Sequence, residues 1–129
     1  MSNERLMPEQ SAISYLESAR RTISLEAAAV AALEARIGEE FSRACELLLK
    51  VRGRIIVTGM GKSGHIARKI AATLASTGSP AFFVHPGEAS HGDMGMITAA
   101  DAVIALSNSG AVPEILTLLP LLKRLGIPL

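Results

Sequence analysis

The sequence has little of three things that would point to particular classes of protein: cysteine, aromatic residues and an excess of charge. Cys45 is the only cysteine among the 129 residues, which excludes an internal disulfide and a cysteine-rich zinc site, and we expect it to pack within a helix. Aromatic residues make up only 3% of the chain. The net charge is +1, which leaves no broad basic surface for a nucleic acid.

Long apolar runs are also missing. None approaches the roughly 20 residues that a membrane-spanning helix needs, and the polar start MSNER is not a secretory signal. What the chain does have is aliphatic residues, because 49% of it is hydrophobic and alanine is abundant. This composition predicts one cytoplasmic domain, or part of one, with closely packed aliphatic side chains inside.

The predicted elements are two helices followed by strands and helices in alternation. Helices are expected over residues 11–36 and 40–50, then strands over 55–58, 81–84 and 102–106, with helices over 64–76 and 113–125. A long glycine-containing loop separates the second strand from the third. The first helix carries apolar residues at roughly helical intervals: Leu16, Ile23, Ala27, Val30 and Ile37. The second helix is expected to bury Phe41, Cys45 and Leu48.

The predicted strands are apolar without polar alternation, and each is followed by a helix. This pattern is typical of a parallel sheet that is covered on both faces. With right-handed crossovers it predicts an α/β fold: a three-layer αβα sandwich with a doubly wound, flavodoxin-like parallel sheet, preceded by two N-terminal helices. We place the helical segment at residues 1–52, packing on the same domain, and the α/β part at 53–129. Ile127 opens a strand that is not finished, so we expect this domain to be incomplete at its C-terminus.

The motif GMGKSG joins the first predicted strand to the helix after it. Gly59, Gly61 and Gly64 let the backbone turn sharply, while the first turn of the helix offers unpaired N–H groups and a positive dipole end. The turn is therefore predicted to hold an anion, with a simple packing turn as the alternative. It is not a P-loop, because Ile56 stands where that motif needs glycine. The dinucleotide pattern GxGxxG is matched, but the second strand ends in His85 and lacks the acid that binds the ribose.

Two more loops follow the predicted strands at their carboxyl ends, where ligand sites form in such sheets. The loop after the second strand reads HPGEASHGD and is rich in histidine and acid. The loop after the third strand, SNSG, precedes a helix that Pro113 starts. It is either a second anion-binding turn or an ordinary turn with a capping serine. Two facing anion turns joined by a loop with histidines predict a binding site.

These segments together, GMGKSGH, FFVHPGEASHGDMGM and ALSNSG with Glu114, resemble the sugar isomerase (SIS) domain of bacterial arabinose-5-phosphate isomerases. The middle segment is the specific part, and the resemblance covers nearly the whole chain. It implies an aldose–ketose isomerase that interconverts D-ribulose 5-phosphate and D-arabinose 5-phosphate through a cis-enediol, for the Kdo sugar of lipopolysaccharide. It also implies a homo-oligomer, and a domain that continues for another strand and helix, usually followed by a regulatory pair of domains.

The resemblance also assigns residues. Lys62, His91 and Glu114 match the family's catalytic positions, and no cofactor is required. Substrate contacts are implied at Gly61, Ser63, Gly78, Ser79, His85, His91, Ser107, Asn108 and Ser109. His85 also matches a position that contacts zinc, but one histidine does not make a metal site. From the residues alone, Glu114 is either a general base or an acid that the helix dipole favours, and His65 is a packing or capping residue.

One position departs from the family. Ala111 stands where a glutamate commonly follows SNSG, so the affinity or the preferred sugar phosphate can differ. Two alternatives therefore stay open: a SIS isomerase for another sugar phosphate, and a non-catalytic regulatory domain that binds a sugar phosphate. Because two further family residues lie beyond Leu129, we expect the fragment alone to turn over little.

Overall fold

The computed structural model describes residues 14–90 and 92–129, and its contacts divide the chain into two units, residues 1–41 and 42–129. In the first unit, α1 spans Tyr15–Leu33 and continues into a 3₁₀ turn, η1, at Glu34–Arg36. A capping box begins the helix: the Ser14 hydroxyl accepts the Glu17 N–H (3.1 Å), and the Glu17 carboxylate accepts the Ser14 N–H (3.2 Å). This confirms the predicted helix, whose expected residues 11–13 lie outside the described part.

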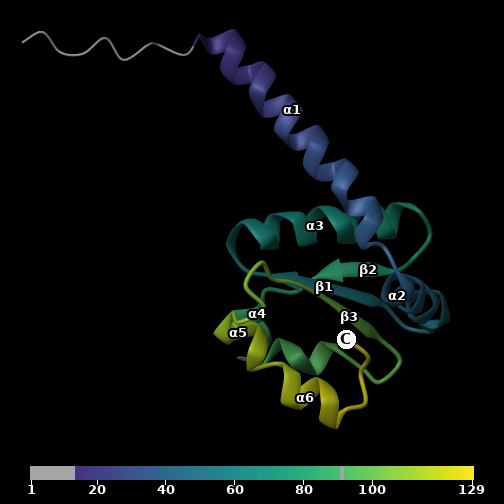
Figure 1. The fold of residues 1–129 in the computed structure, drawn as a ribbon. Helices are drawn as coiled ribbons and strands as arrows, with labels where there is room; N and C mark the ends of the chain where they lie inside the picture. Colours follow the sequence, from purple (N-terminus) through teal and green to yellow (C-terminus); the bar gives the residue numbers. More distant parts are fainter. Residues whose placement is uncertain (1–13, 91) are drawn as a thin grey trace, which may run out of the picture. The chain divides into compact units, whose positions relative to one another are not determined.

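The second unit alternates strands and helices, as predicted (Figure 1). After α2 (Glu39–Lys50) come β1 (Ile55–Gly59), α3 (Gly61–Ser76), β2 (Ala81–Phe83), α4 (Pro86–Ser90), the 3₁₀ turn η2 (Asp93–Met96), β3 (Ala102–Leu106), α5 (Pro113–Leu116) and α6 (Leu119–Arg124). The strands form one parallel sheet in the order β2-β1-β3. This confirms the α/β class and the parallel sheet.

Both faces of the sheet are covered, which makes three layers. On one face, Ile55 and Val57 of β1 pack with Ala67 and Ala71 of α3. On the other face, Ile56 packs with residues from α4, β3, α6 and the connections between them: Val84, Ala89, Ile97, Val103, Leu118, Leu122 and Ile127. Figure 1 shows α3 on one side of the strands and α4 to α6 on the other. Successive side chains of β1 thus pack into opposite layers, as expected for a strand that is buried on both faces.

Several details differ from the sequence-based expectations. The expected loop after β2 contains α4 and η2. The expected helix over 113–125 is two short helices, because Pro120 has no N–H to continue the ladder from α5. In α2, Cys45 and Leu48 are half-buried as expected, but Phe41 is 56% exposed. The prediction for Phe41 was wrong because it is the C-terminal end of α2 that packs on the sheet, through Leu48.

The apolar residues predicted as a stripe on α1 are also exposed. The structure buries none of the side chains of this helix, and the exposed fractions of Leu16, Ile23 and Val30 are 67%, 69% and 65%. The helical spacing predicted the helix correctly.

The contact between Gly59 and Gly64 sets how closely α3 approaches β1. A Cβ on Gly64 would lie 2.7 Å from the carbonyl oxygen of Gly59, and a Cβ on Gly59 would lie 3.0 Å from the Ser63 backbone. The first distance is shorter than non-bonded atoms tolerate and the second is unusually tight, so a side chain at Gly64 in particular would push the helix away from the strand. The two glycines are needed for packing, whatever the turn binds.

A buried carboxylate holds the opposite, amino-terminal edge of the sheet. Asp101, which is 2% exposed, accepts the backbone N–H groups of Arg54 (2.7 Å) and Thr98 (2.8 Å). The Arg54 guanidinium lies 3.6 Å from the carboxylate and over the ring of Phe82 (4.7 Å). Burial alone would raise the pKa of Asp101, but the two N–H bonds and the Arg54 charge outweigh it and hold the pKa below its ordinary value of 3.8.

Replacing Gly64 by alanine should weaken the packing of α3 on β1. We expect Gly64→Ala to lower the free energy of unfolding by about 1–3 kcal/mol, since the new methyl group meets backbone that cannot move aside. Urea unfolding followed by circular dichroism measures the change. Gly38→Ala is the control, because a Cβ there meets only the Glu40 side chain, at 3.7 Å. Equal stability of Gly64→Ala and the wild type would contradict the account.

Replacing Asp101 by asparagine should lower the stability of the fold at neutral pH. It should also remove the part of that stability that is lost in acid. A carboxyl whose pKa is lowered by folding stabilises the fold above its ordinary pKa, and this contribution is lost as the pH falls through the lowered value. We therefore expect Asp101→Asn to lower the free energy of unfolding by about 1–3 kcal/mol at pH 7.

The difference from the wild type should shrink as the pH falls below the ordinary value of 3.8 and through the lowered pKa of Asp101. Urea unfolding between pH 7 and pH 3 tests this, with Glu26→Gln as the exposed control. If the difference in the free energy of unfolding does not change with pH, the charge of Asp101 does not contribute to stability.

Candidate functional site

The candidate site lies at the carboxyl ends of the strands, where the direction of winding changes. The chain passes from β1 to β2 on one side and then to β3 on the other side of β1, which makes the crevice outside β1 and β3 the switch point of the sheet. The register pairs Gly59 with Leu106. The glycine turn and the SNSG loop therefore leave the sheet from neighbouring strand ends.

The first wall of the site is the N-terminus of α3. Gly61 adopts a left-handed conformation (φ 56°) that suits glycine. Met60 precedes the helix and gives no side-chain cap, and the Gly64 N–H donates to the Met60 carbonyl (3.3 Å). The N–H groups of Gly61, Lys62 and Ser63 thus belong to the first turn, where a helix has no internal acceptors. With the exposed Lys62 side chain, this turn can hold an anion.

The second wall begins at His85, which follows β2 and is half-buried. Its Nδ1 accepts the N–H of Gly87 (3.1 Å), and its carbonyl accepts the N–H of Ala89 (2.9 Å), so His85 caps α4. A Cβ on Gly87 would lie 3.2 Å from Nδ1, so glycine is what lets this N–H approach the ring. In the neutral ring the proton is then on Nε2, which can donate a hydrogen bond.

This arrangement does not suit zinc. With Nδ1 accepting an N–H, the ring offers a proton at Nε2 and no lone pair to a metal there. Within residues 14–90 and 92–129, no three His, Cys, Asp or Glu side chains gather as a metal site.

The third wall is the SNSG loop after β3. The Ser107 hydroxyl accepts the N–H of Gly110 (2.9 Å), and the Ser109 hydroxyl accepts the N–H of Ala111 (3.1 Å). Both serines hold the loop itself, and the residue that precedes α5 is Val112, so the alternative of a serine capping this helix was wrong. Each hydroxyl still has its proton to donate. Asn108 is exposed beside them.

Glu114 is the second residue of α5 and is half-buried. Its helix contacts α4, which follows His85. The structure therefore brings most of the predicted residues to one edge of the sheet: Gly61, Lys62, Ser63, His85, Ser107, Asn108, Ser109 and Glu114. His65, which was expected to pack or cap, is exposed on α3.

Two predicted residues are not brought to this edge. Gly78 and Ser79 precede the amino end of β2 and line a cavity of about 510 Å³ together with Cys45 and Leu48. Within this chain they lie at the edge of the sheet opposite to Lys62. His91 lies outside the described residues.

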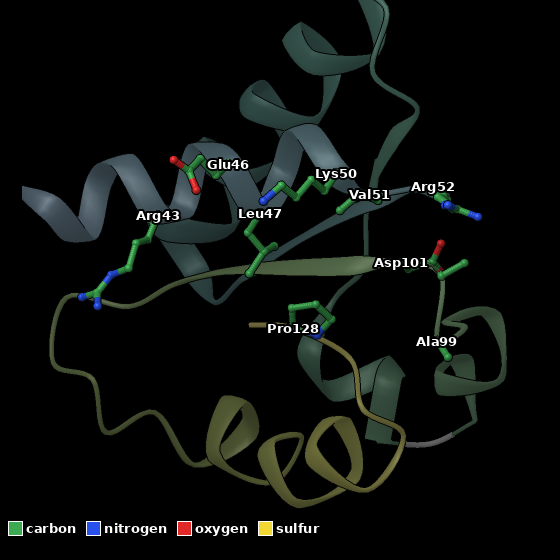
Figure 2. A pocket seen from close by; sticks show the side chains of 10 residues that line it. Arg43, Glu46, Leu47, Lys50, Val51, Arg52, Ala99, Asp101 and Pro128 are labelled. Carbon is green, nitrogen blue, oxygen red and sulfur yellow. The ribbon is translucent and has the colours of Figure 1, made fainter.

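A second cavity, of about 560 Å³, also lies at the amino-terminal edge (Figure 2). Arg43, Leu47 and Lys50 of α2 line it, opposite Asp101 and Pro128. The Asp101 carboxylate already accepts two backbone N–H groups, and ligand sites of parallel sheets form at the other edge. The candidate site is therefore the carboxyl edge.

Sequence reasoning missed Thr58, a buried residue whose hydroxyl donates to the carbonyl of Val84 (2.5 Å) and joins the ends of β1 and β2. The signal was present, since Thr58 is the one hydroxyl in the otherwise apolar run IIVTG.

Comparisons with known proteins agree with this fold. The chain matches the SIS domain over residues 47–129. It is 68% identical over 117 residues to arabinose 5-phosphate isomerase KdsD of Pseudomonas aeruginosa, covering 91% of this chain and 36% of the relative. The Escherichia coli K12 enzyme of the same name is 50% identical over 129 residues, covering 100% and 38%.

Two solved structures are similar as well. An Escherichia coli CFT073 protein in complex with arabinose 5-phosphate aligns with a TM-score of 0.66 at 53% identity, covering 68% of this chain and 47% of that one. A Bacteroides fragilis protein, proposed to be a phosphosugar isomerase in capsule formation, aligns with a TM-score of 0.81 at 38% identity, covering 87% and 59%.

The chain spans little more than a third of the length of the curated relatives it matches. The matched domain accounts for well over half of the chain itself and contains every strand of the sheet and all three loops of the candidate site. The chain belongs to the SIS domain family.

Proposed function

We propose that the protein containing this chain is an aldose–ketose isomerase that interconverts D-ribulose 5-phosphate and D-arabinose 5-phosphate. The observation that carries the proposal is the register of β1 and β3, which sets the uncapped first turn of α3 with Lys62 beside the SNSG loop. The names of the similar proteins support the choice of sugar, and one of them was solved with arabinose 5-phosphate bound.

In this proposal the phosphate binds between the two turns. The N–H groups at the start of α3 and the protons of the Ser63, Ser107 and Ser109 hydroxyls are donors, which suits the acceptor oxygens of a phosphate. The Ser107 and Ser109 oxygens are already bonded to backbone N–H groups, so their protons are the groups left for a ligand. Holding the phosphate fixes the distance from there to the carbonyl end of the sugar.

The reaction moves one proton between neighbouring carbons. Starting from the ketose, a base removes a proton from C1, and the carbonyl oxygen on C2 becomes a hydroxyl of the cis-enediol. Return of a proton to C2 and loss of the proton from O1 then give the aldose. Glu114 is our candidate base, Lys62 stabilises the charge that develops on the oxygens, and the Nε2–H of His85 can donate to one of them. His91 remains a candidate for proton transfer.

The remaining predictions belong to the same proposal. We expect a homo-oligomer, because the apolar side chains of α1 are exposed. We expect the enzyme to act in the cytoplasm, in keeping with its single cysteine, and its product to feed the synthesis of Kdo for lipopolysaccharide. No helix in the described part of the chain is long and apolar enough to cross a membrane.

The proposal is tested by incubating the full-length protein with ribulose 5-phosphate and following arabinose 5-phosphate. We expect product without any added cofactor. If folded protein binds the sugar phosphate but exchanges no C1 or C2 hydrogen with solvent, the regulatory alternative holds instead. If the protein converts only a different sugar phosphate, it is a SIS isomerase for that sugar, the alternative suggested by Ala111.

Replacing Glu114 by glutamine should remove the base while keeping the shape of the side chain. We expect the rate to fall by about 10² to 10⁴, as is usual when a general base is lost. Steady-state assays of kcat measure the loss. Glu46→Gln, an exposed acid on α2, is the matched control and should keep wild-type turnover. Unchanged turnover in Glu114→Gln would reject the role.

Replacing Lys62 by alanine should weaken both substrate binding and turnover, since one positive charge beside the anion turn is removed. We expect kcat/KM to fall by about 10² or more, in line with the loss of an electrostatic stabiliser. Lys69→Ala removes an exposed lysine further along α3 and should leave kcat/KM within about threefold of wild type, because surface charges away from a site act weakly. If kcat/KM is the same in the two variants, Lys62 has no specific role in substrate binding or turnover.

A further inference from the structure

Two polar side chains are buried in the described part of the chain, and they lie at opposite edges of the sheet. Asp101 holds the amino-terminal edge through its bonds to Arg54 and Thr98. Thr58, which is 2% exposed, lies in β1 one residue before the glycine turn of the candidate site. Buried polar groups must be hydrogen-bonded to be tolerated, and the partner of Thr58 is informative.

The Thr58 hydroxyl joins two walls of the candidate site. The backbone pairing of β1 with β2 ends with the Val84 N–H donating to the Val57 carbonyl (3.1 Å). One step further, the Val84 carbonyl accepts the Thr58 hydroxyl at 2.5 Å. Thr58 is bonded to Gly59 along the chain, and Val84 is bonded to His85. The side-chain bond therefore fixes the separation of the glycine turn from His85 at the point where both leave the sheet.

The residues packed around Thr58 are apolar and do not require a hydroxyl at this position. Its side chain lies on the face of the sheet that is packed with apolar residues, namely Ile56, Val84, Ala89, Ile97, Val103, Leu118 and Leu122. Valine has nearly the same shape and would fill this place without burying a polar atom. The gain from one buried hydrogen bond is largely offset by the cost of removing the hydroxyl from water. Stability alone thus gives little reason for threonine.

His85 is in turn held rigidly to Val84. Pro86, the next residue, is fully buried, and the His85 ring accepts the N–H of Gly87 (3.1 Å). A displacement of the Val84 carbonyl should therefore displace the His85 ring and its Nε2–H by a similar amount.

We propose that Thr58 is a positioning residue for the isomerase reaction, which sets the spacing between the Lys62 turn and His85. This inference rests on the proposed function. Thr58 touches no substrate; it acts through Val84 on His85 and through Gly59 on the first turn of α3. A displacement of reacting groups by a fraction of an ångström to an ångström is enough to slow an enzyme by orders of magnitude.

The test uses full-length protein with Thr58→Val, which keeps the shape and removes the hydroxyl, and Thr58→Ser, which keeps the hydroxyl. We expect Thr58→Val to stay folded and to lose about 10- to 100-fold in kcat/KM. Thr58→Ser should recover to within about threefold of the wild type. Thr77→Val is the matched control: its hydroxyl donates to the Thr73 carbonyl (2.8 Å) at the far end of α3, so kcat/KM should not change.

A second readout does not depend on turnover. In protein labelled with ¹⁵N-histidine, the ring nitrogens of His85 should shift in Thr58→Val and return in Thr58→Ser, while those of the exposed His65 stay in place. Wild-type kinetics in Thr58→Val would overturn the proposal, and so would unchanged His85 shifts. Unfolding of Thr58→Val would assign the hydroxyl to stability and overturn it as well. An inactive wild type would instead refute the proposed function, and the His85 shifts would still decide the role of Thr58.

Discussion

The closeness of α3 to the end of β1 is the constraint on which the candidate site depends. At Gly64 the helix backbone comes so near to the Gly59 carbonyl that a Cβ would lie 2.7 Å from it. This contact aims the first turn of α3, with its unpaired N–H groups, at the space beyond the sheet. Because β3 is paired with β1 as far as Gly59 and Leu106, the SNSG loop emerges beside that turn. The proposed anion site therefore depends on the packing of one strand and one helix.

The polar groups inside the fold divide between its two edges. Asp101 binds two backbone N–H groups where the strands begin, and the nearby Arg54 reaches the Met96 carbonyl and the ring of Phe82. Thr58 joins two strands where they end. Between these edges the strands are joined by their backbone ladders, and the buried side chains of the two layers are aliphatic. We infer that the amino edge serves stability, whereas the bond at the carboxyl edge serves the geometry of the site.

Much of this could be predicted from the sequence, because strong local signals agreed with the fold. The unbroken apolar run at Ile55–Val57 marked a strand buried on both faces, and the glycine spacing marked the turn after it. Other features depend on contacts between distant residues. Sequence alone did not show that the His85 ring caps α4, or that the Ser107 and Ser109 hydroxyls bond their own loop. Helical spacing on α1 predicted the helix, but spacing cannot tell which surface covers it.

We propose that a sugar phosphate binds at the carboxyl edge, between the first turn of α3 and the SNSG loop. The decisive test is a crystal structure of the full-length protein with arabinose 5-phosphate. We expect the phosphate within hydrogen-bond distance of the N–H groups of Gly61–Ser63 or of the Ser107 and Ser109 hydroxyls, with the sugar extending toward His85 and Glu114. A phosphate bound instead in the cavity at the amino-terminal edge, beside Lys50 and Asp101, would contradict it.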